Sequence, residues 1–211
     1  MEKLDRDQRY IVDMYIRYAR FLKLAKNRYC NFPTPPLVVV EGDAGSGKSE
    51  LIRILCQVME HEFRERGDNP DQPYIIKGSF TGEAATNIKG MTLHTLFHLN
   101  FGNQLFKLSD KMKDKTRDQL GSLRLVIIDE YSMLSADMLY QINLRLQEIT
   151  MRPDDLFGGV SVILLGNMLQ LPPVNGRQIF EEPSWPDYRK SHIWQPLWEQ
   201  FTPIKLRCNH R

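Results

Sequence analysis

The sequence has few cysteines and no long hydrophobic run. Its three cysteines, Cys30, Cys56 and Cys208, stand far apart in 211 residues. An odd number at this spacing fits neither a disulfide framework nor a Cys-x2-Cys metal site, so a reducing compartment is the simplest interpretation. No apolar stretch approaches the ~20 residues of a membrane-spanning helix, and residues 1–6 lack the apolar core of a signal peptide. We therefore expect an intracellular protein without a membrane partner, and we favour the nucleus slightly over the cytoplasm and mitochondria.

The sequence also lacks a strong excess of either charge. It has 28 Lys and Arg against 26 Asp and Glu, a formal net charge of +2, with 42% hydrophobic and 26% charged residues. A nearly neutral chain has no overall basic field, so any contact with nucleic acid must come from local grooves. The length suits one α/β domain whose sheet is covered on both faces.

A phosphate-binding loop is the clearest motif that is present. Residues 42–49 read Gly-Asp-Ala-Gly-Ser-Gly-Lys-Ser and follow an apolar run at 37–41. In this pattern backbone N–H groups surround a polyphosphate, Lys48 reaches the β- and γ-phosphates, and the Ser49 hydroxyl holds Mg²⁺. The predicted nucleotide contacts are Gly42, Asp43, Ala44, Gly45, Ser46, Gly47, Lys48 and Ser49. The alternative is a Gly-rich turn from strand to helix that binds no ligand.

The spacing of apolar residues predicts alternating helices and strands. Helices are predicted over 5–29, 51–63 and 134–149, and the charged segment 107–119 is an exposed connection or a short surface helix. Strands are predicted over 37–41, 74–77, 123–128, 160–165 and 203–206. This order indicates an α/β fold with a parallel sheet of about five strands and helices on both faces. Ligands of such folds bind outside the carboxyl ends of the strands.

Polar groups follow two of these strands. Asp129 and Glu130 directly follow the predicted strand at 123–128. Asp129 is suited to positioning Mg²⁺, and Glu130 to deprotonating an attacking water. Adjacent acids are also ordinary at a solvated helix start. After the next strand, Gln170 stands in an otherwise apolar turn, and its amide can donate to a γ-phosphate and accept from water.

These segments together resemble consecutive motifs of the petite-integration-frequency (PIF) DNA helicases of superfamily one. The segments are 42–49, 81–94, 127–133 and the stretch from Phe157-Gly158-Gly159 to 170–174. Their spacing is similar to that of the helicases of Helitron transposons. A RecD or relaxase-type helicase shares some motifs, but Phe157-Gly158-Gly159 and the double proline at 172 and 173 favour the PIF type.

The resemblance implies a RecA-like P-loop ATPase domain at 37–211, preceded at 1–36 by an N-terminal helix and a Pro-rich linker. It implies ATP and Mg²⁺ as cofactors and, for the complete enzyme, 5′-to-3′ translocation on single-stranded DNA. The chain stops before a second RecA-like domain, which we expect as its partner. With one wall of the nucleotide cleft, it is not expected to unwind DNA by itself. We expect a monomer, and the alternative function is a non-catalytic nucleotide-binding or interaction module.

Two residues near the chain ends take roles from the resemblance. Gln8 is similar to the glutamine that reads the adenine edge in these helicases, or it completes an N-terminal capping box with Asp5. Arg211 resembles the arginine that stabilises charge at the γ-phosphate, or it is an ordinary surface arginine. The predicted catalytic set is Glu130, Lys48, Gln170 and Arg211.

The resemblance also places a track for single-stranded DNA along 80–97 and the turn at 171–174. Hydroxyl and imidazole groups suit phosphates, glycines permit close approach, and phenylalanines can stack on bases. The predicted DNA contacts are Phe80, Gly82, Thr92, His94, Phe97, Pro172 and Val174. Phe97 is alternatively a core residue, and His94 a satisfied polar side chain. Asn167 departs from the family, which usually has aspartate there, and the lost charge could weaken coupling to Mg²⁺ or DNA.

Overall fold

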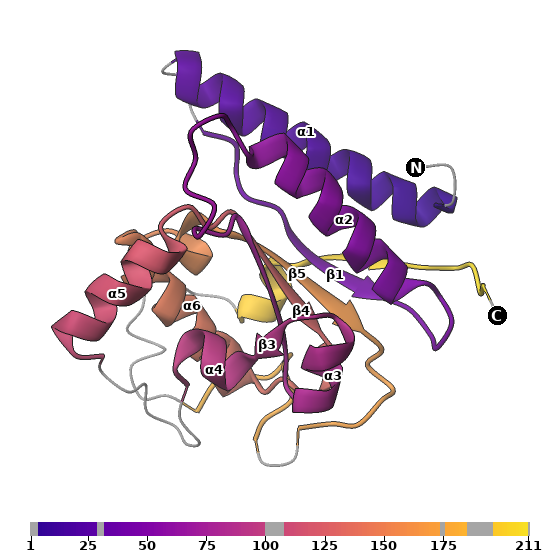
Figure 1. Cartoon of the computed structure of the whole chain (residues 1–211). Helices are drawn as coiled ribbons and strands as arrows, with labels where there is room; N and C mark the ends of the chain where they lie inside the picture. Colours follow the sequence, from indigo (N-terminus) through magenta and orange to yellow (C-terminus); the bar gives the residue numbers. More distant parts are fainter. Residues whose placement is uncertain (1–3, 29–31, 100–107, 174–175, 185–195, 211) are drawn as a thin grey trace.

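The computed structural model describes residues 4–28, 32–99, 108–173, 176–184 and 196–210. Within them, six parallel strands form one sheet in the order β3-β2-β4-β5-β1-β6 (Figure 1). The strands are β1 Leu37–Glu41, β2 Ile75–Ser79, β3 Met91–Thr92, β4 Leu125–Asp129, β5 Ser161–Gly166 and β6 Thr202–Lys205. The predicted parallel α/β fold is confirmed. The strand that was not predicted is β3, which is only two residues long.

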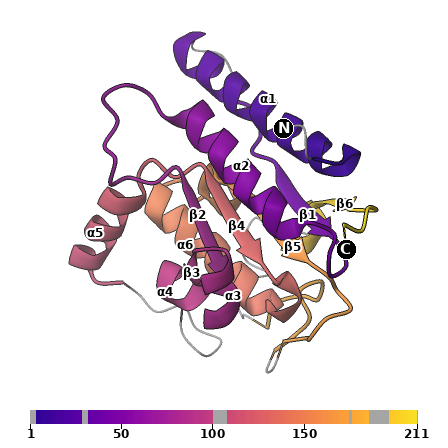
Figure 2. The same cartoon turned by 45° about the vertical axis from the view of Figure 1, so that its right-hand side comes forward.

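Helices cover both faces of this sheet. The α-helices are α1 Arg6–Arg28, α2 Lys48–Phe63, α3 Gly82–Asn87, α4 Leu93–Phe97, α5 Asp110–Leu120 and α6 Ala136–Thr150. Short 3₁₀ helices are η1 Tyr131–Met133, η2 Leu156–Gly159 and η4 Leu197–Gln200. Figures 1 and 2 show α1 and α2 side by side over one face, with α5 and α6 beyond the other. No helix among the described residues is long and apolar enough to cross a membrane.

Two apolar cores lie on opposite faces of the sheet because successive strand residues point to opposite sides. From β4, Val126 and Ile128 join the core that contains α6. Leu125 and Ile127 join the core that contains α1 and α2. Coverage on both faces explains why the central strands are apolar throughout. Since α1 shares a core with α2, the N-terminal helix packs as part of the same unit as the ATPase fold.

The register of the central strands brings their carboxyl ends to one edge of the sheet. Glu41 pairs with Gly166, and Asp129 pairs with Leu165. Just beyond β1, the Gly42 N–H donates to the Gly166 carbonyl at 2.9 Å. The phosphate-binding loop, the two acids and the turn after β5 therefore meet at one edge.

Segments from the two ends of the sequence also reach this edge. The Arg207 N–H donates to an Asp7 carboxylate oxygen at 3.1 Å, and His210 Nε2 lies 3.0 Å from Asp5 Oδ2. Figure 2 shows the segment after β6 beside the loop between β1 and α2. The start of α1 and the residues after β6 therefore both flank the phosphate-binding loop.

Candidate nucleotide-binding site

The phosphate-binding loop turns tightly between β1 and α2. Gly45 and Gly47 have φ values of 89° and 80°, in the left-handed region that glycine adopts without steric cost. A Cβ atom on Gly47 would also lie 2.4 Å from Gln8 Nε2. The backbone conformation therefore favours glycine at position 47, and an added Cβ atom would also displace the Gln8 amide.

Lys48 is held by carbonyl groups of its own loop. Its Nζ donates to the Gly42 oxygen at 2.6 Å and to the Asp43 oxygen at 3.0 Å. Burial lowers the pKa of Lys48. The carboxylates that oppose this effect on the pKa are those of Asp129, Asp43 and Glu130. The lysine thus lies near the acids that end β4, and phosphate oxygens would replace the two carbonyls as its partners.

Asp129 is a half-buried acid at the end of β4. Its Oδ1 accepts the Glu130 N–H at 3.0 Å, and its backbone oxygen accepts the Ser79 hydroxyl at 3.1 Å. Burial raises the pKa of Asp129, against the lowering effects of the Glu130 N–H and of Lys48. A half-buried carboxylate of this kind is stabilised by a cation.

Asp129 and Ser49 carry the oxygen atoms that would hold Mg²⁺ in the predicted site. Ser49 is exposed at the start of α2 and supplies a hydroxyl oxygen, and Asp129 supplies carboxylate oxygens, the ligand atoms that Mg²⁺ takes. No cluster of three or more His, Cys, Asp or Glu suited to a metal is found in the described part of the chain. Mg²⁺ at such a site would take most of its ligands from phosphates and water.

Glu130 has an unusual backbone conformation and borders a pocket. Its φ and ψ are 56° and 46°, which non-glycine residues adopt rarely and which occur often at functional sites. The pocket has a volume of about 410 Å³ and is also lined by Gln170. Its other lining residues are Ser132, Met133, Leu169, Leu171 and Pro172. The predicted base and the predicted γ-phosphate sensor therefore border the same space.

Asn167 connects this region to the phosphate-binding loop. Its Nδ2 donates to Asp43 Oδ1 at 2.8 Å, and its Oδ1 accepts the Leu169 N–H at 2.9 Å. The Asn167 backbone oxygen accepts the Gln170 N–H at 3.0 Å. The departure from aspartate at this position therefore does more than remove a charge, because the amide hydrogen-bonds a carboxylate of the loop.

Gln8 forms the capping box and also contacts the phosphate-binding loop. It is only 2% exposed, and its Nε2 donates to the Ser46 oxygen at 3.2 Å and the Gly47 oxygen at 3.4 Å. Its Oε1 accepts the Asp5 N–H at 3.2 Å, while Asp5 Oδ1 accepts the Gln8 N–H at 2.9 Å. The capping box is present together with a contact to the phosphate-binding loop. The adenine-reading role remains a prediction.

Sequence reasoning missed three side chains at this edge. The Tyr131 hydroxyl donates to the Glu41 carboxylate, which joins the ends of β4 and β1. The His210 N–H donates to the Gly45 oxygen at 2.9 Å, and its ring pairs with Asp5. The available signals were the position of Glu41 directly before the loop and of Tyr131 directly after the acids. His210 gave no such signal, because only the fold brings it to the loop.

Only some of the predicted DNA contacts lie close together in the structure. Phe80 and His94 meet edge to face with ring centroids 5.8 Å apart, and burial lowers the pKa of His94. The Thr92 hydroxyl accepts the Thr95 N–H at 3.3 Å and caps α4. Gly82 is exposed at the start of α3. These residues occupy one region, and their contact with DNA remains a prediction.

Phe97 does not belong to such a track. Its side chain is fully buried in the core that contains α6, so the prediction that it stacks on a base is wrong. The reason is its place on α4, whose buried face also carries Leu93 and Leu96. Pro172 is exposed in the turn after β5. Val174 and Arg211 lie outside the described residues.

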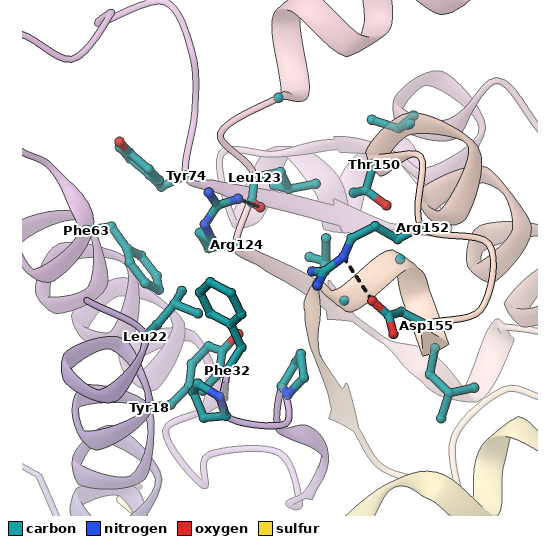
Figure 3. Close-up of a pocket in the computed structure, with 18 of the residues that line it drawn as sticks. Tyr18, Leu22, Phe32, Phe63, Tyr74, Leu123, Arg124, Thr150, Arg152 and Asp155 are labelled. Carbon is teal, nitrogen blue, oxygen red and sulfur yellow. Dashed lines mark hydrogen bonds and ion pairs between the residues drawn. The ribbon is translucent and has the colours of Figure 1, made fainter. Parts of the chain in front are cut away.

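A larger pocket, of about 880 Å³, lies at the opposite end of the sheet (Figure 3). Leu37, Arg124 and Val160 line it at the amino ends of β1, β4 and β5. Aromatic side chains, Tyr18 and Phe32 among them, form part of its wall. Since nucleotides bind parallel α/β folds at the carboxyl ends of strands, this pocket is not the nucleotide site.

The sheet and the loop at its carboxyl edge define the chain as a RecA-like α/β domain of the P-loop class. Comparison with known proteins agrees with this class and identifies the family within it. The profile of the PIF1-like helicase family matches residues 25–211. The chain therefore belongs to the PIF1-like helicases, as a first RecA-like domain.

Individual relatives support this assignment. The chain is 33% identical over 138 residues to the ATP-dependent DNA helicase PIF1 of Emericella nidulans, a match covering 63% of this chain and 17% of the relative. It is 29% identical over 198 residues to PIF1 of Saccharomyces cerevisiae, covering 88% and 21%. The crystal structure of Bacteroides Pif1 bound to single-stranded DNA superposes with a TM-score of 0.63 at 27% identity, covering 96% and 41%. The chain thus spans less than half the length of these proteins.

Proposed function

We propose that this chain binds and hydrolyses Mg-ATP as the first motor domain of a DNA helicase that moves 5′ to 3′ on single-stranded DNA. The observation that carries the proposal is the convergence of Lys48, Asp129 and Glu130 at one sheet edge, where both acids act on the pKa of the lysine. Relatives named ATP-dependent DNA helicases and one solved with single-stranded DNA support it.

Binding of ATP begins with the phosphate-binding loop. Lys48 leaves the carbonyls of Gly42 and Asp43 for the β- and γ-phosphates, and loop N–H groups surround the phosphates. Ser49 and Asp129 would hold Mg²⁺, which when bound neutralises charge on the phosphate oxygens. Gln8, already bonded to the Ser46 carbonyl, lies beside the loop and would contact the adenine edge.

Hydrolysis requires a positioned water. Glu130 orients that water and takes its proton, while Gln170, on the same pocket, hydrogen-bonds the water or the γ-phosphate. Arg211 would approach the γ-phosphate from the end of the chain. Translocation needs the second RecA-like domain to open and close over the nucleotide, so the proposed movement along DNA belongs to a protein that contains both domains.

The decisive experiment replaces Glu130 by glutamine in a protein that includes the second domain. We expect hydrolysis with single-stranded DNA to fall by about a hundredfold or more, because the base is lost. Affinity for a Mg-ATP analogue, measured by calorimetry, should stay within about twofold of wild type. Unchanged hydrolysis would show that Glu130 is not the base.

A matched control removes a carboxylate far from the site. Glu60 lies on α2 and pairs with Arg64, and Glu60→Gln should leave hydrolysis unchanged. If the wild-type protein with both domains binds the analogue but hydrolyses no ATP, the chain is instead a non-catalytic nucleotide-binding module.

A further inference from the structure

We propose that Asn167 and Asp43 form a matched pair that holds the phosphate-binding loop against the turn bearing Gln170, with Asn167 as the positioning residue. The inference rests on the proposed nucleotide binding and extends it to how the loop is held and what it contacts. It starts from the 2.8 Å hydrogen bond between Asn167 Nδ2 and Asp43 Oδ1.

The surroundings of Asn167 fix which way its amide faces. Its Oδ1 accepts the Leu169 N–H at 2.9 Å, so its Nδ2 is left to face Asp43. An ionised carboxylate only accepts hydrogen bonds and a backbone N–H only donates them. Asparagine offers one atom suited to each partner. Aspartate would satisfy the Leu169 N–H but would set two carboxylates against each other.

Asp43 carries the contact into the working part of the loop. Its backbone oxygen accepts Lys48 Nζ at 3.0 Å and the Ser46 N–H at 3.1 Å. Its carboxylate also acts on the pKa of Lys48. A hydrogen bond that fixes the Asp43 side chain therefore also fixes the carbonyl that holds the phosphate-binding lysine.

The backbone of Asn167 contacts Gln170, the predicted γ-phosphate sensor. Its backbone oxygen accepts the Gln170 N–H at 3.0 Å. When phosphates replace the Asp43 carbonyl as the partner of Lys48, the contacts of Asp43 change. The carboxylate of Asp43 is hydrogen-bonded to Asn167, which belongs to the turn that carries Gln170. The pair holds the phosphate-binding loop in a defined shape and joins it directly to the turn that carries Gln170.

An exchange of the two residue types tests the pair. The proteins are wild type, Asn167→Asp, Asp43→Asn and the double variant Asp43→Asn/Asn167→Asp, which has the same composition and net charge as wild type. Each is titrated with a non-hydrolysable Mg-ATP analogue by calorimetry, and the melting temperature of each is measured without nucleotide.

The pair predicts an order of affinities that independent sites would not produce. Asn167→Asp should weaken analogue binding about fivefold, since a hydrogen bond to a charged group is replaced by repulsion. Asp43→Asn should weaken it by only about twofold, because two facing amides still form a hydrogen bond. The double variant should return to within about twofold of wild type, with the amide and the carboxylate exchanged.

Two outcomes would overturn the inference. One is a double variant as weak as, or weaker than, Asn167→Asp, because the effects then simply add. The other is an Asn167→Asp variant that binds and melts as wild type does. If wild type fails to bind the analogue, the proposed function fails, and the melting temperatures still decide the pair: Asn167→Asp should melt lower than wild type, and the double variant should recover.

Discussion

The Gln8 side chain donates its amide to the carbonyl of Ser46, 3.2 Å away and 38 positions later in the sequence. Its Oε1 meanwhile accepts the N–H of Asp5. The acceptor atom of Gln8 therefore helps to cap the start of α1, and its donor atom contacts the phosphate-binding loop. Because the two roles use different atoms, a single substitution can separate them.

Gln8→Glu keeps the acceptor of the capping box and replaces the donor with a charged oxygen. That oxygen would face the carbonyls of Ser46 and Gly47, so we expect the loop to be displaced and the affinity for a Mg-ATP analogue to fall about tenfold, or ~1.4 kcal/mol. Calorimetric titration measures the affinity.

Gln147→Glu is the matched control. Gln147 lies on α6, where its Nε2 donates to the Asp155 carbonyl at 3.0 Å, so this variant loses a similar hydrogen bond away from the loop. It should cost stability without changing nucleotide affinity. Equal loss of affinity in the two variants would mean that Gln8 acts only through stability.

The sheet was predictable because its central strands are covered on both faces and read as continuous apolar runs. The strand β3 was not, since its pairing involves only Met91 and Thr92 beside Gly78 and Ser79, too few residues for any periodicity. For a similar reason the sequence left Phe97 between a core position and a DNA contact. A helix of five residues does not show from sequence which of its faces is covered.

Motif positions predicted which strand ends carry polar groups but not the partners of those groups. Asn167 and Asp43 are 124 positions apart, and only the register of β1 with β5 brings them together. Gln8 was compatible with a cap and with a nucleotide contact, and the fold shows the cap together with hydrogen bonds to carbonyls of the phosphate-binding loop. Side-chain amides offer a donor and an acceptor, so their role depends on the tertiary structure.

Asp129 gives the fold a stability that depends on pH. Burial raises its pKa, so the folded chain binds more protons than the unfolded chain between the ordinary aspartate value, near ~3.9, and the raised value. The free energy of unfolding therefore falls as pH rises through this window. Asp129→Asn is uncharged and still accepts the Glu130 N–H, so it should lack this decrease and exceed wild type in stability at neutral pH.

Urea unfolding of wild type and Asp129→Asn from about pH 4 to about pH 7 measures the difference. The gain in stability should accompany a loss of affinity for the Mg-ATP analogue of at least about tenfold, because the proposed Mg²⁺ ligand loses its negative charge. Asp13→Asn, at an exposed position of α1, should match wild type in both measurements. A variant at position 129 that is less stable than wild type at neutral pH would contradict the role given to burial.

Gly158 explains part of the motif Phe157-Gly158-Gly159 by packing. Its φ is +60°, and a Cβ atom would lie 2.6 Å from the Leu146 backbone oxygen on α6. Phe157 is fully buried, and its N–H donates to Asn143 Oδ1 at 2.7 Å. The segment that helped to indicate the family therefore fixes η2 against α6 and lies away from the nucleotide edge.

Gly158→Ala should lower the free energy of unfolding by about 2 kcal/mol or more, because it combines a left-handed backbone with a clash against a helix backbone. Chemical denaturation of the purified chain measures the change. Gly82→Ala is the control, since a Cβ atom there meets nothing within 4 Å. It should leave stability unchanged or raise it by up to ~1 kcal/mol, because alanine favours the helix. Equal stabilities for the two variants would show that α6 shifts to accommodate the added Cβ atom.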